Sequence, residues 1–163
     1  MKKSIFVILV LTLGILFVSC TKPAESESSA AEKQFNNVIK DLQNKLPGSE
    51  FCDKYVYMEN LTEEEKNTGK NQLSLILGFL YSTSDIKSYK VENIKISSKP
   101  ADAPAKIEKI ATANITITLE SKTDPVETET ETSEENLIYI NGKWYGVYLY
   151  KEGTEVKSYP EMS

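Results

Sequence analysis

The sequence contains no arginine and no histidine, and it has only two cysteines. Without guanidinium groups the chain cannot make the bidentate contacts that recognise phosphates and carboxylates. Without imidazole it has neither the most common general base near neutral pH nor the most common metal ligand. These absences exclude histidine-dependent catalysis, and they leave lysines, carboxylates and aromatic residues to carry whatever chemistry the chain performs.

The N-terminal residues have the parts of a bacterial export signal. Two lysines follow the first methionine, residues 5–18 are almost wholly apolar, and Ser19 precedes Cys20. A membrane-spanning helix needs about 20 apolar residues, whereas this run has the length of a secretory segment. A small residue before a cysteine is typical of a lipobox, so we predict cleavage after Ser19 and lipidation of Cys20. An uncleaved anchor and an ordinary cleaved signal are the alternatives, and Phe17 departs from the usual leucine.

This N-terminus predicts a protein of the bacterial cell envelope. Its lipid anchor would hold it to a membrane, with the outer membrane or cell surface favoured and the domain outside the cytoplasm. Removal of residues 1–19 leaves 17 lysines against 24 acidic residues, a net charge of −7. That charge opposes binding to nucleic acid. With Cys20 acylated, Cys52 has no partner for an intramolecular disulfide, and we interpret it as a semi-buried packing residue.

The rest of the chain divides by composition. Residues 20–29 are polar and predict a flexible tether, residues 30–151 predict a single domain, and residues 152–163 predict a C-terminal tail. Within the domain, Ser29 and Glu32 match a capping box at the start of a helix that ends at Pro47-Gly48.

Two further segments precede the strands. Residues 49–61 fit either a short helical turn or a strand, and we favour the turn. Thr62 and Glu65 form a second capping box, which opens a helix to about Ser82 that Gly69 could divide. Because Leu75 and Phe79 widen its apolar face, we expect this helix to be well buried.

The pattern changes to period two after Ser84. Two alternating runs of opposite phase predict a strand with a bulge near Glu92-Asn93, and residues 98–106 predict a loop. Residues 114–120 alternate most regularly and predict a half-buried strand. The acidic residues 123–135 fit either the exposed end of a long strand or a hairpin tip.

Asn141-Gly142 predicts a two-residue hairpin turn, because both central residues of that turn need positive φ. In this register Tyr139 faces Trp144. One strand face then carries the four aromatic residues that we consider the best candidate for a binding face; they are Tyr139, Trp144, Tyr148 and Tyr150. Burial in the core, a protein interface and a small-ligand pocket are the alternatives for this set.

Asn141-Gly142-Lys143-Trp144 and the segment 85–92 resemble parts of the nuclear transport factor two-like (cystatin-like) superfamily, in which small bacterial lipoproteins occur. The resemblance spans about residues 30–151. It implies an α+β fold, with N-terminal helices packed on a curved, cone-shaped antiparallel sheet of about four strands. The enzymes of the superfamily that this chain resembles, such as ketosteroid isomerase and SnoaL-like cyclases, use an aspartate or histidine base. Tyrosine or aspartate side chains act beside it as hydrogen-bond donors inside the cone.

The sequence identifies no catalytic residue, cofactor site or metal site. Asp53 and Asp85 lie at element boundaries, without a tyrosine at a fixed spacing. Glu127, Glu129 and Glu131 would share one side of a strand, where a solvated edge is the simpler interpretation than weak calcium binding. We therefore expect a non-enzymatic binding or interaction module, which uses a sheet face or a cone pocket to bind an envelope protein, an apolar small ligand or a second copy. The alternatives are a ketosteroid isomerase-like or SnoaL-like enzyme with a pocket carboxylate, and a purely structural surface lipoprotein.

Overall fold

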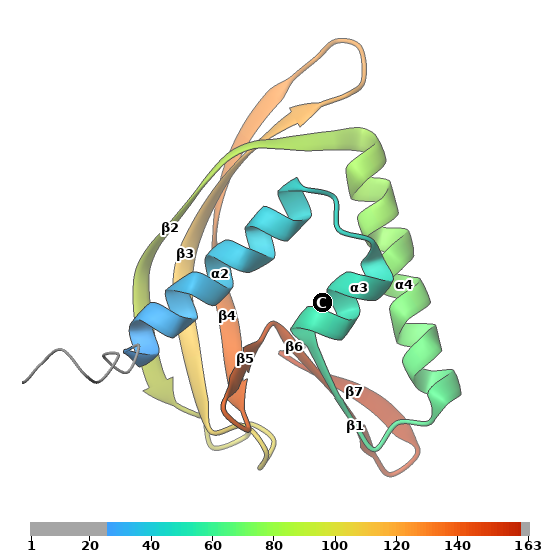
Figure 1. The fold of residues 1–163 in the computed structure, drawn as a ribbon, viewed down its shortest axis with the longest axis vertical. Coiled ribbons are helices and arrows are strands. Elements are labelled where there is room, and N and C mark those ends of the chain that lie inside the picture. Colours follow the sequence, from blue (N-terminus) through green and yellow to red (C-terminus); the bar gives the residue numbers. More distant parts are fainter. Residues whose placement is uncertain (1–25, 161–163) are drawn as a thin grey trace, which may run out of the picture.

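The computed structural model describes residues 26–160, which form three helices and seven strands (Figure 1). The predicted signal peptide and Cys20 lie outside these residues. The helices are α2 (Glu27–Gln43), α3 (Gly48–Tyr55) and α4 (Glu63–Thr83). The strands are β1 (Val56–Glu59), β2 (Ser84–Ser98), β3 (Lys109–Ser121), β4 (Thr128–Ile140), β5 (Lys143–Tyr145), β6 (Val147–Glu152) and β7 (Glu155–Tyr159).

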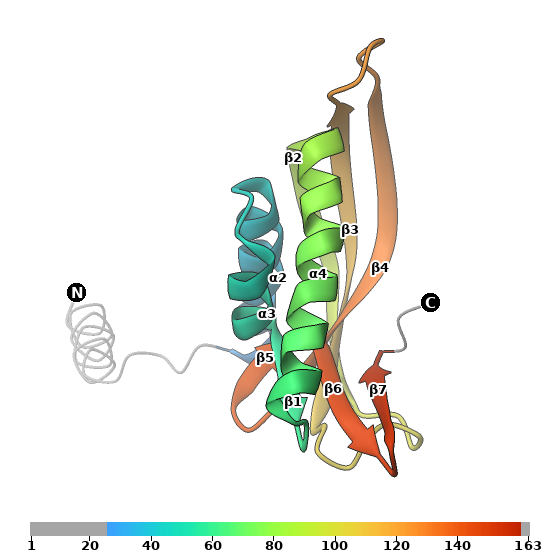
Figure 2. The same ribbon diagram turned by 90° about the vertical axis from the view of Figure 1, so that its right-hand side faces the viewer.

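The strands form two sheets. The larger sheet is antiparallel with the order β2-β3-β4-β5, and the smaller has the order β1-β6-β7, in which β1 runs parallel to β6. The larger sheet curls around α2 (Figure 1), and the helices stand on one side of it (Figure 2). The predicted α+β class, with helices packed on a curved sheet of about four strands, is confirmed, and the small second sheet adds to it.

Local signals in the sequence placed the strand connections correctly. Asn141 and Gly142 both have positive φ, and Tyr139 pairs with Trp144 as the turn predicts. The register of β2 against β3 shifts after Glu92, where Asn93 has a φ of 56°, so the predicted bulge is confirmed. Both interpretations of the acidic segment apply in part, because residues 128–135 form the exposed end of the long strand β4 and residues 123–127 form the tip of the β3–β4 hairpin.

The helix starts were predicted with mixed success. Thr62 and Glu65 form the predicted capping box, and α4 runs unbroken through Gly69. The first helix begins earlier than predicted, because Ser26 rather than Ser29 caps it and accepts a hydrogen bond from the Ser29 backbone. The predicted tether therefore loses its last residues to α2.

The C-terminal segment is not only a tail. Residues 155–159 pair with β6 as the strand β7. The sequence did not indicate this strand, because the segment is short and polar, and its strand conformation depends on backbone hydrogen bonds to β6 rather than on an alternating apolar pattern.

The largest group of buried side chains lies between α2 and the part of the larger sheet formed by the first half of β3 and the end of β4. Phe35 and Ile39 of α2 are 2% exposed and pack on Ala111, Ala113 and other sheet residues. A second cluster joins Ile138 and Ile140 to Tyr148. A third cluster holds α3 against α4 through Phe51, Tyr55 and Leu77.

The prediction that α4 is well buried is wrong. Leu77 is buried against α3, but Leu75, Ile76 and Phe79 are 76%, 64% and 72% exposed. One side of α4 therefore packs on its neighbours while an adjoining apolar side stays uncovered.

Candidate functional site

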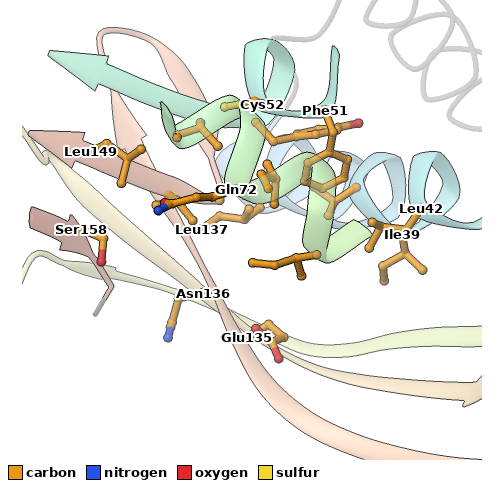
Figure 3. A pocket seen from close by; sticks show the side chains of 18 of the residues that line it. Ile39, Leu42, Phe51, Cys52, Gln72, Glu135, Asn136, Leu137, Leu149 and Ser158 are labelled. Atoms are coloured by element: carbon orange, nitrogen blue, oxygen red, sulfur yellow. The ribbon is translucent and has the colours of Figure 1, made fainter. Parts of the chain in front are cut away.

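The main cavity of the described residues is a cleft between the helices and the two sheets (Figure 3). Its volume is about 830 Å³. Ile39 and Leu42 of α2 and Phe51 and Cys52 of α3 border it on the helical side. Residues of β3, β4, β6 and β7 border it on the strand side, among them Ile115, Leu137, Leu149 and Ser158.

Exposure separates the floor of the cleft from its mouth. The floor consists of apolar side chains that are themselves buried, including Phe35, Ile39, Ile115 and Leu137. The mouth consists of exposed residues from α4 on one side and from β4 and β7 on the other, which are Glu64, Thr68, Gln72, Ile76, Glu135, Val156 and Lys157. An apolar interior with a few polar groups at the opening is the usual composition of a small-ligand site.

Close packing of the helices determines where the cleft opens. A Cβ at Gly48 would lie 2.3 Å from the Ser74 Cα atom, so α3 meets α4 at a point where only glycine fits. This contact directs Leu73 and Leu77 toward α3 and α2. The neighbouring stripe of α4, with Gly69 and Ile76, then faces the strands across the cleft.

The thiol that borders the cleft lacks the features of a reactive cysteine. Cys52 is 1% exposed and unpaired, and burial raises the pKa of its thiol. A reactive cysteine needs the opposite shift. Cys52 is therefore more completely buried than the semi-buried position expected from the sequence.

Tyr55 forms the only tyrosine–aspartate pair with a hydroxyl contact among the described residues. Its hydroxyl donates to Asp41 Oδ2 at 2.5 Å. Burial raises the pKa of Tyr55, and the hydrogen bond to Asp41 raises it further. Burial would raise the pKa of Asp41, but hydrogen bonds from Lys54 and Tyr55 outweigh it and lower the pKa. Asp41 lies outside the cleft lining, so this pair stabilises the α2–α3 contact and does not supply a pocket base.

Glu65 is the most perturbed carboxylate at the cleft. Lys151 Nζ donates to its Oε1 at 2.7 Å, and the Thr62 backbone N–H donates to its Oε2 at 2.7 Å. These two hydrogen bonds lower the pKa of Glu65 to about 2. A general acid in a pocket needs a raised pKa, so Glu65 is suited to structure and not to proton transfer.

The four aromatic residues proposed from the sequence do not form one face. Tyr139 and Trp144 have ring centroids 4.8 Å apart and join the core under α2. Tyr148 and Tyr150 have centroids 4.9 Å apart and join the second cluster. Their use as a binding face stays a prediction, but the expected continuous surface is divided.

The division occurs at Gly146. Its backbone N–H donates to the Tyr55 carbonyl at 2.8 Å, and the chain leaves β5 there and enters the other sheet as β6. Tyr148 is 4% exposed, and its hydroxyl donates to Glu59 Oε2 at 2.5 Å. That hydrogen bond is the main reason why the pKa of Glu59 is lowered.

The remaining carboxylates singled out in the sequence lie at the surface. Asp53 pairs with Lys70 at 2.5 Å, and Asp85 pairs with Lys45 at 2.8 Å. Glu129 and Glu131 stand opposite Leu119 and Ile117 in the register, and Glu131 borders a second, smaller cavity. Among residues 26–160 no group of three acidic or cysteine side chains is arranged to hold a metal ion.

Sequence reasoning proposed a cone pocket as one possible site, but it did not predict the position or the lining of the cleft. The signal that pointed to it was the wide apolar surface of α4, where Leu73, Ile76, Leu77 and Phe79 cover more of the helix than one packing face needs. Such a surface is consistent with a fully buried helix or with a helix that borders an open groove. Only the positions of the strands in the folded protein decide which of these occurs.

Comparison with known proteins found two solved structures with a similar arrangement of helices and strands. No family model matches the chain, and the comparison with curated proteins found no significant match. A Campylobacter jejuni structure named as an NTF2-like transpeptidase is 16% identical, covers 75% of this chain and 98% of its own, and has a TM-score of 0.46. An Erwinia carotovora atroseptica ketosteroid isomerase-like structure is 12% identical, covers 74% and 91%, and has a TM-score of 0.48. At these values neither likeness bears on the activity of this chain.

Proposed function

We propose that this chain is a lipid-anchored protein of the bacterial cell envelope whose domain binds an apolar small ligand without catalysing a reaction. The supporting observation is the cleft of about 830 Å³, whose floor is apolar and buried. Ligand sites in proteins commonly have volumes of about 300–1,000 Å³ and mostly apolar linings.

The titratable groups support binding over catalysis. Among the described residues, three carboxylates line the cleft: Glu64 and Glu135 are exposed at its mouth, and Glu65 is half-buried. Glu65 is engaged by Lys151 and the Thr62 backbone. The buried tyrosine that lines the cleft, Tyr55, directs its hydroxyl to Asp41. An acid or base beside a donor inside the cavity, which an isomerase-like reaction requires, is not formed by these residues.

The membrane anchor rests on the sequence. The apolar run, Ser19 and Cys20 support lipidation, and no helix within residues 26–160 is long and apolar enough to cross a membrane. We expect Cys20→Ala expressed in a bacterial host to lose radiolabelled palmitate and to move from the detergent phase to the aqueous phase. Unchanged labelling and partitioning of the variant would contradict lipidation.

Ligand binding is tested by narrowing the cleft. A Cβ at Gly69 would contact Leu149 at 3.4 Å, so Gly69→Gln places a longer side chain in the cleft while keeping a residue that suits a helix. Gly78→Gln is the matched control, because nothing lies within 4 Å of its Cβ position on the same helix. We expect a neutral solvatochromic dye such as Nile red to bind saturably to the wild type and the control, and at least about tenfold more weakly to Gly69→Gln. Equal binding to all three proteins would place the dye elsewhere and contradict the proposal.

A further inference from the structure

The cleft continues into a second cavity along the inner face of the larger sheet. This cavity has a volume of about 270 Å³. The two share the residues Leu42, Ile115, Ile117, Ser133 and Glu135, so they form one groove. Beyond the shared part, Leu80, Ile86 and Leu119 extend the apolar lining. A groove of this form suits a ligand with an elongated apolar part.

The register of β4 places carboxylates beside this apolar lining. Glu131 is opposite Ile117 and Ser133 is opposite Ile115, while Glu135 lies on the same face one step further. Side chains two residues apart on a strand share a face. Both glutamates are exposed and line the groove, so an acidic row borders the apolar lining on the β4 side.

The charges at the groove do not balance. Within residues 26–160, Lys157 is the one lysine that lines either cavity, and it is paired with Glu152. Glu65 is paired with Lys151. Among the described residues, Glu64, Glu131 and Glu135 have no lysine ion pair, although the structure contains many such pairs elsewhere. The mouth of the groove therefore carries uncompensated negative charge.

This imbalance discriminates between ligands. A fatty acid, a sulfate or a phosphate head would meet carboxylates and no free cation, and the chain has no arginine or histidine to replace one. Like charges brought together at a low-dielectric surface repel, whereas an opposite charge gains attraction there. A positively charged head would restore neutrality at the mouth while the apolar part lies on the buried floor.

We propose that the ligand of the groove is an amphiphile with an apolar tail and a cationic head, held beside Glu131 and Glu135. This inference rests on the proposed binding function and adds the class of ligand. The tail contributes affinity by leaving water, and the carboxylates contribute selectivity for the head.

The test uses three probes that share one tail, namely dodecyltrimethylammonium, dodecyl maltoside and dodecyl sulfate, each below its micelle concentration and titrated calorimetrically. We expect the cationic probe to bind about tenfold more tightly than the neutral one, since each exposed ion pair contributes modestly, and the anionic probe to bind most weakly. Raising the salt to about 0.5 M should shrink the preference, because exposed charges are then screened.

Two double variants separate a local effect from net charge. Glu131→Gln/Glu135→Gln should abolish the preference for the cationic probe and leave the binding of dodecyl maltoside unchanged. Glu32→Gln/Glu50→Gln removes the same charge from exposed residues that line neither cavity, and it should keep the preference.

The outcomes distinguish the two proposals. If no probe binds and Nile red does not bind, the binding function itself fails. If the probes bind equally, if the sulfate binds most tightly, or if the control variant loses the preference as fully as Glu131→Gln/Glu135→Gln, the cationic-ligand inference is overturned while the cleft remains a binding site.

Discussion

Glu65 shows how one side chain can join two parts of the molecule. It completes the capping box of α4 through Thr62, and it also accepts a hydrogen bond from Lys151 of β6. The first contact is local and was predicted from the sequence. The second joins residues 86 positions apart, and it connects the start of α4 to the smaller sheet at one end of the cleft.

The pH dependence of stability tests this arrangement. The folded-state pKa of Glu65, about 2, lies below its ordinary value of 4.5, so folding favours the ionised form. The stabilisation is therefore complete above about pH 4.5 and is lost as the pH falls toward 2. Glu65→Gln keeps a side chain that can still cap the helix. We expect it to lower the free energy of urea unfolding at pH 7, with a difference from wild type that narrows below pH 4.5.

Glu64→Gln is the control for that experiment, because Glu64 has no ion pair among the described residues. It should change the pH dependence much less. A difference between Glu65→Gln and wild type that stays constant from pH 7 to pH 2.5 would show that the charge of Glu65 does not stabilise the fold.

At the scale of elements, α4 determines the site because it is packed on one side only. Two glycines show this: Gly48 of α3 packs against Ser74 of α4, whereas Gly78 of α4 has no atom within 4 Å of its Cβ position. The Gly48 contact packs α4 against α3, while Ile76 and Phe79 stay 64% and 72% exposed.

The two glycines predict changes of opposite sign. Gly48→Ala forces a Cβ to 2.3 Å from a backbone atom of α4, and such overpacking typically costs about 1–3 kcal/mol. Gly78→Ala fills open space in a helix and should stabilise by up to about 1 kcal/mol. Chemical denaturation of both variants measures these differences. Two changes of the same sign would contradict the described α3–α4 contact.

At the scale of the molecule, a well-packed core under α2 lies beside an open groove. The apolar side chains of α2 and the sheet pack under α2, while the upper part of β4 carries exposed acidic residues and pairs on one side only. Acidic side chains on an open strand edge discourage pairing with other chains. Ile76 of α4 and Glu135 of this strand both line the cleft.

Exposure predicts which apolar residues of α4 the fold needs. Leu75→Lys/Phe79→Lys changes residues that are 76% and 72% exposed, so we expect the free energy of unfolding to change by less than about 1 kcal/mol. Leu77→Ala, at a residue that is 6% exposed, should cost about 2–4 kcal/mol. Urea titrations compare them. A loss of several kcal/mol in the double lysine variant would mean that these side chains are covered in solution.

The sequence by itself determined the local features. The cap at Thr62, the Asn141-Gly142 turn with its register and the bulge near Asn93 depend on neighbouring residues and on backbone conformations that few residue types adopt. Together with the two periodicities, they were sufficient for the α+β class.

Only the tertiary structure decided which apolar surfaces are covered. The chain passes from one sheet to the other at Gly146, so Tyr148 and Trp144 lie in different sheets. Leu75 and Phe79 of α4 are exposed, against expectation. The physical reason is that the hydrophobic effect has no direction. An apolar pattern shows that a face tends to leave water, but contacts between residues far apart in the chain decide whether protein covers that face or a cleft remains open beside it.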